Sequence, residues 1–192
     1  MKSNASYPNQ RVGIFVDVQN LYHSAKNLYR GRVNYAELIK HLVGDRQLIR
    51  AMAYVVKSEG IVETTPHPDR VAQHEHDAKI DVSTEAAFFE ALEKAGLELR
   101  MKDLQVWADG AKKADWDVGM AVDAIRMSSF LDVIILVTGD GDFLPLIDYL
   151  KWGAGRVVEV AAFRRSASAK LQEAADNFIG IEDVPRAVMK KR

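Results

Sequence analysis

The chain has 192 residues, 48% of them hydrophobic, and a formal net charge of −1 at pH 7. This length suits one α/β domain, and the composition is that of a globular protein and not of a disordered or polycationic one. Because the chain has no cysteine, disulfides, thiolate metal sites and cysteine nucleophiles are excluded. Without an apolar run of membrane-spanning length or a hydrophobic signal core, we expect no membrane association and a cytoplasmic protein.

Strand-like runs alternate with helical periods along the chain. We expect strands at 12–17, 48–57, 97–101, 132–138 and 156–161, an edge strand at 178–181, and helices at 20–29, 34–43, 84–95, 116–127, 142–152 and 167–175. Such alternation predicts βα units, and therefore an α/β fold with a mainly parallel sheet. We expect residues 1–10 to be a flexible N-terminus, 11–183 a single domain and 184–192 a basic C-terminal tail.

One long segment does not fit this alternation. Residues 58–82 show neither a helical nor a strand period, and a loop of that length is usually functional or mobile. His74, His76 and Asp77 in it have donor types that bind zinc. We favour a His-rich loop, because no further convergent ligand is evident in the sequence.

Aspartates follow two of the predicted strands. Asp17 ends the first, and Asp140 and Asp142 follow the strand at 132–138, directly after Thr138 and Gly139. Because the carboxyl ends of parallel strands share one edge of the sheet, we expect these acids to converge. Clustered carboxylates resist ionising together unless a cation neutralises them. Oxygen donors suit Mg²⁺ or Mn²⁺, so the pattern predicts a metal-dependent phosphate-processing site.

Asp142 and Asn20 each have two interpretations. Alternate residues of an extended segment point the same way, so Asp140 and Asp142 can face one cation, and Asp142 can also cap the next helix. Asn20, three residues after Asp17, is positioned to hold a metal-bound water or a phosphate oxygen, or simply to cap its helix. Thr138 is expected to orient water or phosphate.

Three acids around the helix at 116–127 compete for the remaining ligand position. Asp123 lies six residues beyond Asp117, which is roughly 120° around a helix and about 9 Å along it, so the two cannot readily share one ion. We favour Asp117 as the ligand and keep Asp115 and Asp123 as supporting alternatives. Lys112 and Lys113 form either a solvated pair or a contact for a phosphate backbone.

Positive charge is concentrated near the C-terminus. Residues 151–192 contain 9 Lys and Arg against 5 Asp and Glu, a balance of +4, which leaves 17 − 22 = −5 for residues 1–150. The first interpretation is a solvated basic surface. The second is a basic rim containing Arg164, Arg165 and Lys170 that binds a nucleic-acid backbone.

Three segments together resemble the NYN branch of the PIN-like nuclease superfamily, in its bacterial LabA-like group. They are Phe15–Leu21, with Asp17 and Asn20, then Lys113–Asp123, and then Leu136–Leu146. The resemblance implies a Rossmann-like three-layer α/β/α PIN-like domain. It also implies Mg²⁺- or Mn²⁺-dependent ribonuclease activity, with a site made of Asp17, Asn20, Asp117, Asp140 and Asp142.

The resemblance leads us to predict a hydrolytic mechanism. Asp17, Asp117, Asp140 and Asp142 would hold one or two ions, and attack by water would leave 5′-phosphate and 3′-hydroxyl ends on RNA. A DNA-directed or structure-specific nuclease, a regulatory RNA-binding module and a phosphohydrolase are the alternatives. A possible homodimer would widen a basic groove. No Gly-x-Gly-x-x-Gly follows the first strand and no Walker A loop is present, which disfavours dinucleotide and P-loop sites.

Overall fold

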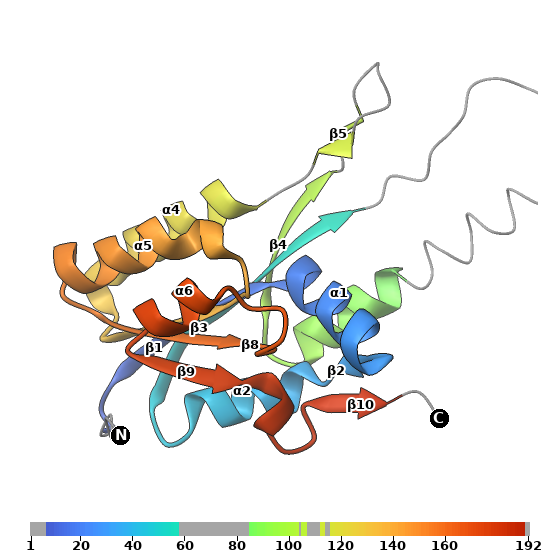
Figure 1. Ribbon diagram of the computed structural model, residues 1–192, viewed down its shortest axis with the longest axis horizontal. Coiled ribbons are helices and arrows are strands. Elements are labelled where there is room, and N and C mark those ends of the chain that lie inside the picture. Colours follow the sequence, from blue (N-terminus) through green and yellow to red (C-terminus); the bar gives the residue numbers. More distant parts are fainter. Residues whose placement is uncertain (1–6, 58–84, 104, 107–111, 114–115, 191–192) are drawn as a thin grey trace, which may run out of the picture.

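A six-stranded parallel sheet forms the centre of the computed structural model, which describes residues 7–57, 85–103, 105–106, 112–113 and 116–190. The strand order is β4-β3-β1-β7-β8-β9 (Figure 1). The strands are β1 (Arg11–Asp17), β3 (Gln47–Lys57), β4 (Glu98–Asp103), β7 (Val133–Val137), β8 (Val157–Ala162) and β9 (Asn177–Gly180). Since every neighbouring pair is parallel, the predicted sheet is confirmed.

Helices cover both faces of this sheet. Figure 1 shows α1 (Val18–Tyr29) and α2 (Tyr35–Val43) on one side, and α4 (Asp117–Met127), α5 (Leu144–Asp148) and α6 (Ala169–Ala174) on the other. Residues 85–94 form a further helix, and its Leu92 packs in the same core cluster as α1 and α2. The result is the expected three-layer α/β/α architecture.

Side-chain alternation along β1 explains the two cores. Val12, Ile14 and Val16 belong to the cluster under α1 and α2, whereas Phe15 belongs to the cluster under α4 and α5. Successive strand residues point to opposite faces, so a strand buried on both sides is apolar throughout. This is why the runs at 12–16 and 133–137 could be recognised in the sequence.

Several short elements were not predicted. β2 (Gly31–Val33) and β10 (Val188–Lys190) pair in antiparallel fashion, as do β5 (Gln105–Val106) and β6 (Lys112–Lys113). Part of the segment 184–192, expected to be a tail, therefore forms a strand. Val184 and Ala187 are buried in the core just before it, which anchors the segment to the domain.

The predicted helix at 142–152 is divided into three pieces. A 3-10 turn at Gly141–Phe143 leads into α5, and a π-helical turn at Tyr149–Gly153 follows it. Pro145 lies in the first turn of α5, where the missing N–H has no helical partner to lose.

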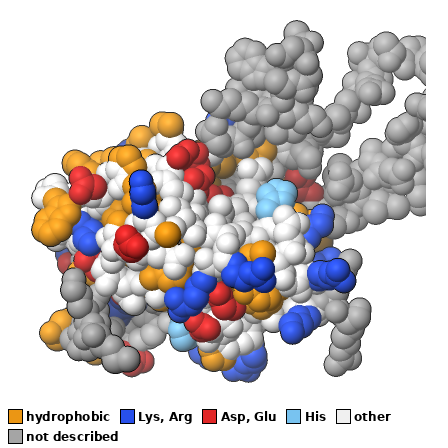
Figure 2. Space-filling view, viewed as in Figure 1, with side chains coloured by type: hydrophobic (Ala, Val, Ile, Leu, Met, Phe, Trp, Pro, Cys, Tyr) orange, Lys and Arg blue, Asp and Glu red, His pale blue; other side chains and the backbone are white. Residues whose placement is uncertain are grey.

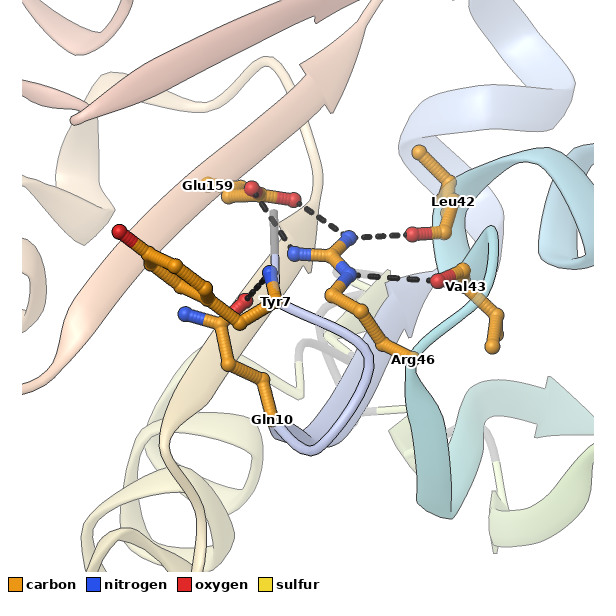
Figure 3. A network of polar contacts seen from close by, with 6 residues as sticks. All are labelled: Tyr7, Gln10, Leu42, Val43, Arg46 and Glu159. Atoms are coloured by element: carbon orange, nitrogen blue, oxygen red, sulfur yellow. Dashed lines mark hydrogen bonds and ion pairs between the residues drawn. The ribbon is translucent and has the colours of Figure 1, made fainter. Parts of the chain in front are cut away.

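Ion pairs join elements at the amino end of the sheet. The two terminal guanidinium nitrogens of Arg46, Nη1 and Nη2, donate to the Glu159 carboxylate at 3.0 Å, and each partner side chain is only 8% exposed. Arg46 also donates to the carbonyl oxygens of Leu42 and Val43, so its donors are satisfied by α2 as well as by β8 (Figure 3). Nearby, the Arg11 guanidinium holds the pKa of Asp132 down to about 2.

None of the helices in the described part of the chain has the length and apolar character needed to cross a bilayer.

Candidate active site

The first strand has β3 and β4 on one side and β7, β8 and β9 on the other, so the strand order changes direction beside β1. Ligands of open α/β sheets bind at the carboxyl end of such a point. Here Asp17 ends β1, and Thr138 follows β7. The Thr138 hydroxyl donates to Asp17 Oδ2 at 3.0 Å, which brings together residues 121 positions apart.

The Asp17 carboxylate is largely enclosed. Burial raises its pKa, and the nearby Asp140 carboxylate adds to the rise. Hydrogen bonds from the backbone N–H of Asn20 and from Thr138 act in the opposite direction. The carboxylate is thus oriented by two donors but poorly solvated, a state that a bound cation would stabilise.

Asn20 connects α1 to the turn after β7. Its side-chain oxygen accepts a hydrogen bond from the backbone N–H of Gly139 at 3.0 Å. The same turn is ordered by Thr138, whose hydroxyl oxygen accepts from the N–H of Asp140 at 3.2 Å. The predicted capping role of Asn20 is wrong, because Asp17 caps α1 and accepts from the Asn20 backbone N–H. Its other role, holding a water or a phosphate oxygen, stays a prediction, because an amide that accepts through oxygen still has two N–H donors.

Asp140 and Asp142 have different environments. The N–H of Asp142 donates to Asp140 Oδ1 at 3.0 Å, while the Asp142 side chain itself is exposed. The chain turns into a 3-10 conformation at Gly141, so the alternation expected of an extended segment ends there. Asp142 therefore orients Asp140 through its backbone and is not among the residues that line the pocket beside it.

That pocket has a volume of about 210 Å³ and lies between β1, β3, α1 and α4. Three of the predicted ligands contribute to its wall. Its lining residues are Asp17, Gln19, Asn20, His23, Tyr54, Trp116, Asp117 and Asp140. The pocket thus combines carboxylates with aromatic rings, and its donors to a cation are oxygens and one imidazole.

The aromatic side of the pocket is rigidly held. Trp116 Nε1 donates to the carbonyl oxygen of Val55 at 2.9 Å, and its ring centroid lies 5.5 Å from that of Tyr54. A Cβ added to Gly119 would lie 2.5 Å from Trp116 Cε3, so the ring packs directly over the α4 backbone. A glycine in the first turns of a helix is explained here by this close approach.

Asp123 is buried behind this wall and does not line the pocket. Its carboxylate accepts from the Tyr54 hydroxyl at 3.1 Å and pairs with Arg100 at 3.2 Å. Its neighbours are thus a phenol and a guanidinium, and it supports Tyr54 from behind. Asp115 and the loop at 58–82, with its histidines, lie outside the described residues, as do the side chains of Lys112 and Lys113.

The predicted basic rim lies on the loop after β8, which contains Arg164 and Arg165, and on the start of α6, which contains Lys170. Ser168 N–H donates to the carbonyl oxygen of Gly139 at 3.0 Å, which places this loop against the Asp140 turn. Arg164 pairs with Asp183 at 2.8 Å and lies over the Phe178 ring. Arg165 and Lys170 are exposed. Arg164 therefore already has a carboxylate partner, and binding a phosphate with this side chain would compete with that ion pair.

The pocket offers the type of ligand atom that a hard cation prefers, but its side chains do not lie at the distances of a metal site. Three carboxylates line one pocket, and oxygen is the donor that Mg²⁺ and Mn²⁺ prefer. Among the residues that the structure describes, however, no group of three or more His, Asp or Glu side chains is close enough to hold a metal ion. Binding of an ion by Asp17, Asp117 and Asp140 therefore stays a prediction.

Four lining residues were missed in the sequence: Gln19, His23, Tyr54 and Trp116. His23 lies one helical turn beyond Asn20, a spacing that puts them on the same side of α1. Trp116 immediately precedes Asp117. Tyr54 is level with Asp17 in the pairing of β1 with β3, which only the strand order reveals.

The sequence model of the NYN domain matches residues 11–182. The chain belongs to the NYN domain family. This confirms the family that the three motifs resemble, while the LabA-like branch stays a prediction. The NYN family falls within the PIN-like nuclease superfamily, so this NYN domain is nuclease-like.

A solved structure with a similar sequence agrees with the fold. A protein of unknown function, VPA0982, from Vibrio parahaemolyticus RIMD 2210633 superposes with a TM-score of 0.76 at 28% identity, covering 96% of this chain and 99% of that one. A PLP-bound putative aminotransferase from Clostridium difficile 630 gives a TM-score of only 0.23 at 10% identity, covering 75% of this chain and 34% of that one. A comparison with curated proteins found no match.

Proposed function

We propose that this NYN domain is a metal-dependent ribonuclease whose site is the pocket at the carboxyl ends of β1 and β7. The observation that carries the proposal is the hydrogen bond from Thr138 to Asp17, which holds a poorly solvated carboxylate beside Asp140 at the switch point of the sheet. DNA is the alternative substrate, since water as the nucleophile does not need a ribose 2′-hydroxyl.

Asp17, Asp117 and Asp140 would hold Mg²⁺ or Mn²⁺, with Asp142 orienting Asp140. When bound, the ion lowers the pKa of water and offsets the negative charge that develops on the phosphate. Water adds to phosphorus, the bond from phosphorus to the 3′-oxygen breaks, and that oxygen takes up a proton. The products carry 5′-phosphate and 3′-hydroxyl ends.

The remaining pocket residues position the phosphodiester. Thr138 and the Asn20 backbone fix the direction of the Asp17 carboxylate. The Asn20 amide nitrogen is suited to donate to a phosphate oxygen. Trp116 and Tyr54 form an apolar wall that limits the access of bulk water, which strengthens charge interactions inside the pocket.

The test is cleavage of end-labelled single-stranded and hairpin RNA, with matched DNA, in Mn²⁺, Mg²⁺ or EDTA. Asp140→Asn should reduce cutting by about 100-fold or more, because losing a ligand costs at least as much as the 10–100-fold loss typical of an outer-shell partner. Asp45→Asn is the matched control, since Asp45 is an exposed acid just before β3, at the opposite edge of the sheet. Products with cyclic 2′,3′-phosphate ends would overturn the hydrolytic mechanism.

A second candidate is a regulatory RNA-binding module. It is favoured by the absence, among the described residues, of three acids already close enough to hold an ion. On this alternative, wild type and Asp140→Asn both bind RNA and neither cuts it in any metal. Cutting that depends on metal and is lost in Asp140→Asn excludes it.

A further inference from the structure

The solvent face of α1 runs directly out of the pocket. Its exposed positions repeat at helical spacing, and Gln19 and His23 at its start line the pocket. Tyr22, Lys26 and Arg30 continue the exposed face away from the pocket. From His23 to Arg30 the helix rises by about 10 Å, so this face is a continuous surface that begins at the proposed site of cleavage.

Aromatic and cationic groups are combined on this face. The Tyr22 ring is 45% exposed and meets the His23 ring edge-on, with 5.4 Å between centroids. Lys26 Nζ lies 5.5 Å from the centroid of the Tyr22 ring. The sequence of α1, Val18–Tyr29, contains neither Asp nor Glu, although the chain as a whole has 27 acids against 26 Lys and Arg.

The cationic surface extends beyond the end of α1. The Tyr29 and Phe163 rings pack with centroids 5.0 Å apart, which brings the loop after β8 alongside the helix. Burial and the nearby Glu182 carboxylate raise the pKa of the Tyr29 hydroxyl, and Arg165 in that loop acts in the opposite direction, so both an acid and a cation lie near this end of α1. Figure 2 shows Lys and Arg side chains gathered over α1 and the β2–β10 pair, at the lower right of the view, with some acids close by.

Arg30 occupies a position that normally favours glycine. It ends α1 with φ of 49°, in the left-handed region, and its N–H donates to the Lys26 carbonyl oxygen. A side chain in this conformation is unfavourable, and glycine is the usual residue at such a helix end. Arg30 therefore lowers the stability of the folded protein relative to glycine, but it adds a cation to the exposed face of α1.

We propose that this face, formed by Tyr22, His23, Lys26 and Arg30, binds single-stranded RNA and guides it into the pocket. An unpaired base stacks on the Tyr22 ring, and Lys26, Arg30 and Arg165 contact the phosphates. Duplex RNA is disfavoured, because its bases are already stacked and paired and cannot cover an exposed ring. The inference rests on the proposed nuclease function and adds the substrate class.

The test measures binding separately from cutting. A fluorescent single-stranded RNA and a matched duplex are titrated in EDTA, where no metal-dependent cleavage occurs. Tyr22→Ala should weaken single-strand binding about tenfold or more and leave duplex binding unchanged. Tyr22→Phe, which keeps the ring, should bind as wild type. Tyr149→Ala is the matched control, because Tyr149 is 49% exposed and lies far along the chain on the turn after α5.

A second variant tests the same face without destabilising the protein, so that weaker binding cannot be attributed to unfolding. Arg30→Gly should raise the melting temperature, because glycine accepts φ above zero, and should still weaken single-strand binding. Equal binding by Tyr22→Ala and Tyr149→Ala overturns the face as a platform, as does a wild type that does not bind single strands in EDTA. If binding depends on Tyr22 but the wild type cuts nothing, the platform stands and the nuclease proposal falls.

Discussion

The side-chain oxygen of Asn20 accepts a hydrogen bond from the Gly139 N–H, at 3.0 Å, and so joins the start of α1 to the turn after β7. Asn20→Ala leaves that N–H without its partner, and we expect the free energy of unfolding to fall by about 1–3 kcal/mol. Asn20→Asp keeps an acceptor for Gly139 but removes the amide donors and adds negative charge. Both variants should lose cleavage activity. Wild-type activity in Asn20→Asp would limit the residue to holding the turn.

Asp17 should reduce the stability of the metal-free protein at neutral pH. Burial raises its folded-state pKa above the ordinary value of 3.8, so the folded protein holds this proton more tightly than the unfolded chain. Stability therefore falls as pH rises from 3.8 through the raised pKa, and stays lower above it. Asp17→Asn should therefore raise the melting temperature at pH 7. For a domain of this size, a gain of about 1 kcal/mol in the free energy of unfolding corresponds to about 2–4 °C. The same variant should abolish cleavage.

Asp132 is the control for this experiment, because its pKa is shifted in the opposite direction to that of Asp17. Its folded-state pKa is lowered to about 2 by Arg11, so its stabilisation is present above 3.8 and is lost as pH falls toward 2. Asp132→Asn should therefore lower the melting temperature slightly at pH 7, since the pair is partly exposed. Thermal unfolding in EDTA across pH 3–8 distinguishes the two; a melting temperature of Asp17→Asn below wild type at pH 7 contradicts the argument.

Gly119→Ala should disturb the pocket. This is expected although alanine favours a helix over glycine by about 1 kcal/mol. The new Cβ would lie 2.5 Å from Trp116 Cε3, so the indole must move. We expect a shift in Trp116 emission, measured with Trp107 and Trp152 changed to Phe, together with reduced cleavage. Val118→Ala, at a 74% exposed position of the same helix, should change neither.

Arg46→Ala should be among the most destabilising single changes at a polar position. It leaves the Glu159 carboxylate buried without its bidentate partner, and breaking a buried pair in this way costs about 3–5 kcal/mol. Arg50→Ala removes the same residue type from an exposed pair with Glu98 and should cost less than about 1 kcal/mol. Urea unfolding compares them, and equal losses would show that burial does not decide the effect.

The central strands and amphipathic helices could be predicted because burial leaves a direct record in the sequence. The runs at 12–16 and 133–137 are apolar on both faces, and each ends beside a polar residue at the shared edge. From those ends alone Asp17 and Asp140 were correctly brought together. Homodimerisation and the ligand set stay predictions.

The rest depends on contacts between distant segments. β2 and β10 have three residues each and gain their pairing only from each other, so neither carries a pattern of its own. The position of Tyr54 in the pocket wall follows from strand order, and the position of Asp142 outside that wall follows from a 3-10 turn where we expected extended chain. Local periodicity contains none of this information.

The pairing of β1 with β7 also determines when activity can first arise during protein synthesis. The 121 positions between Asp17 and Thr138 take roughly 6–24 s to translate at about 5–20 residues per second. Until then Asp17 has left the ribosome without Thr138 or Asp140 beside it. A growing chain therefore has no assembled acid pocket until the codons for Thr138 and Asp140 have been translated.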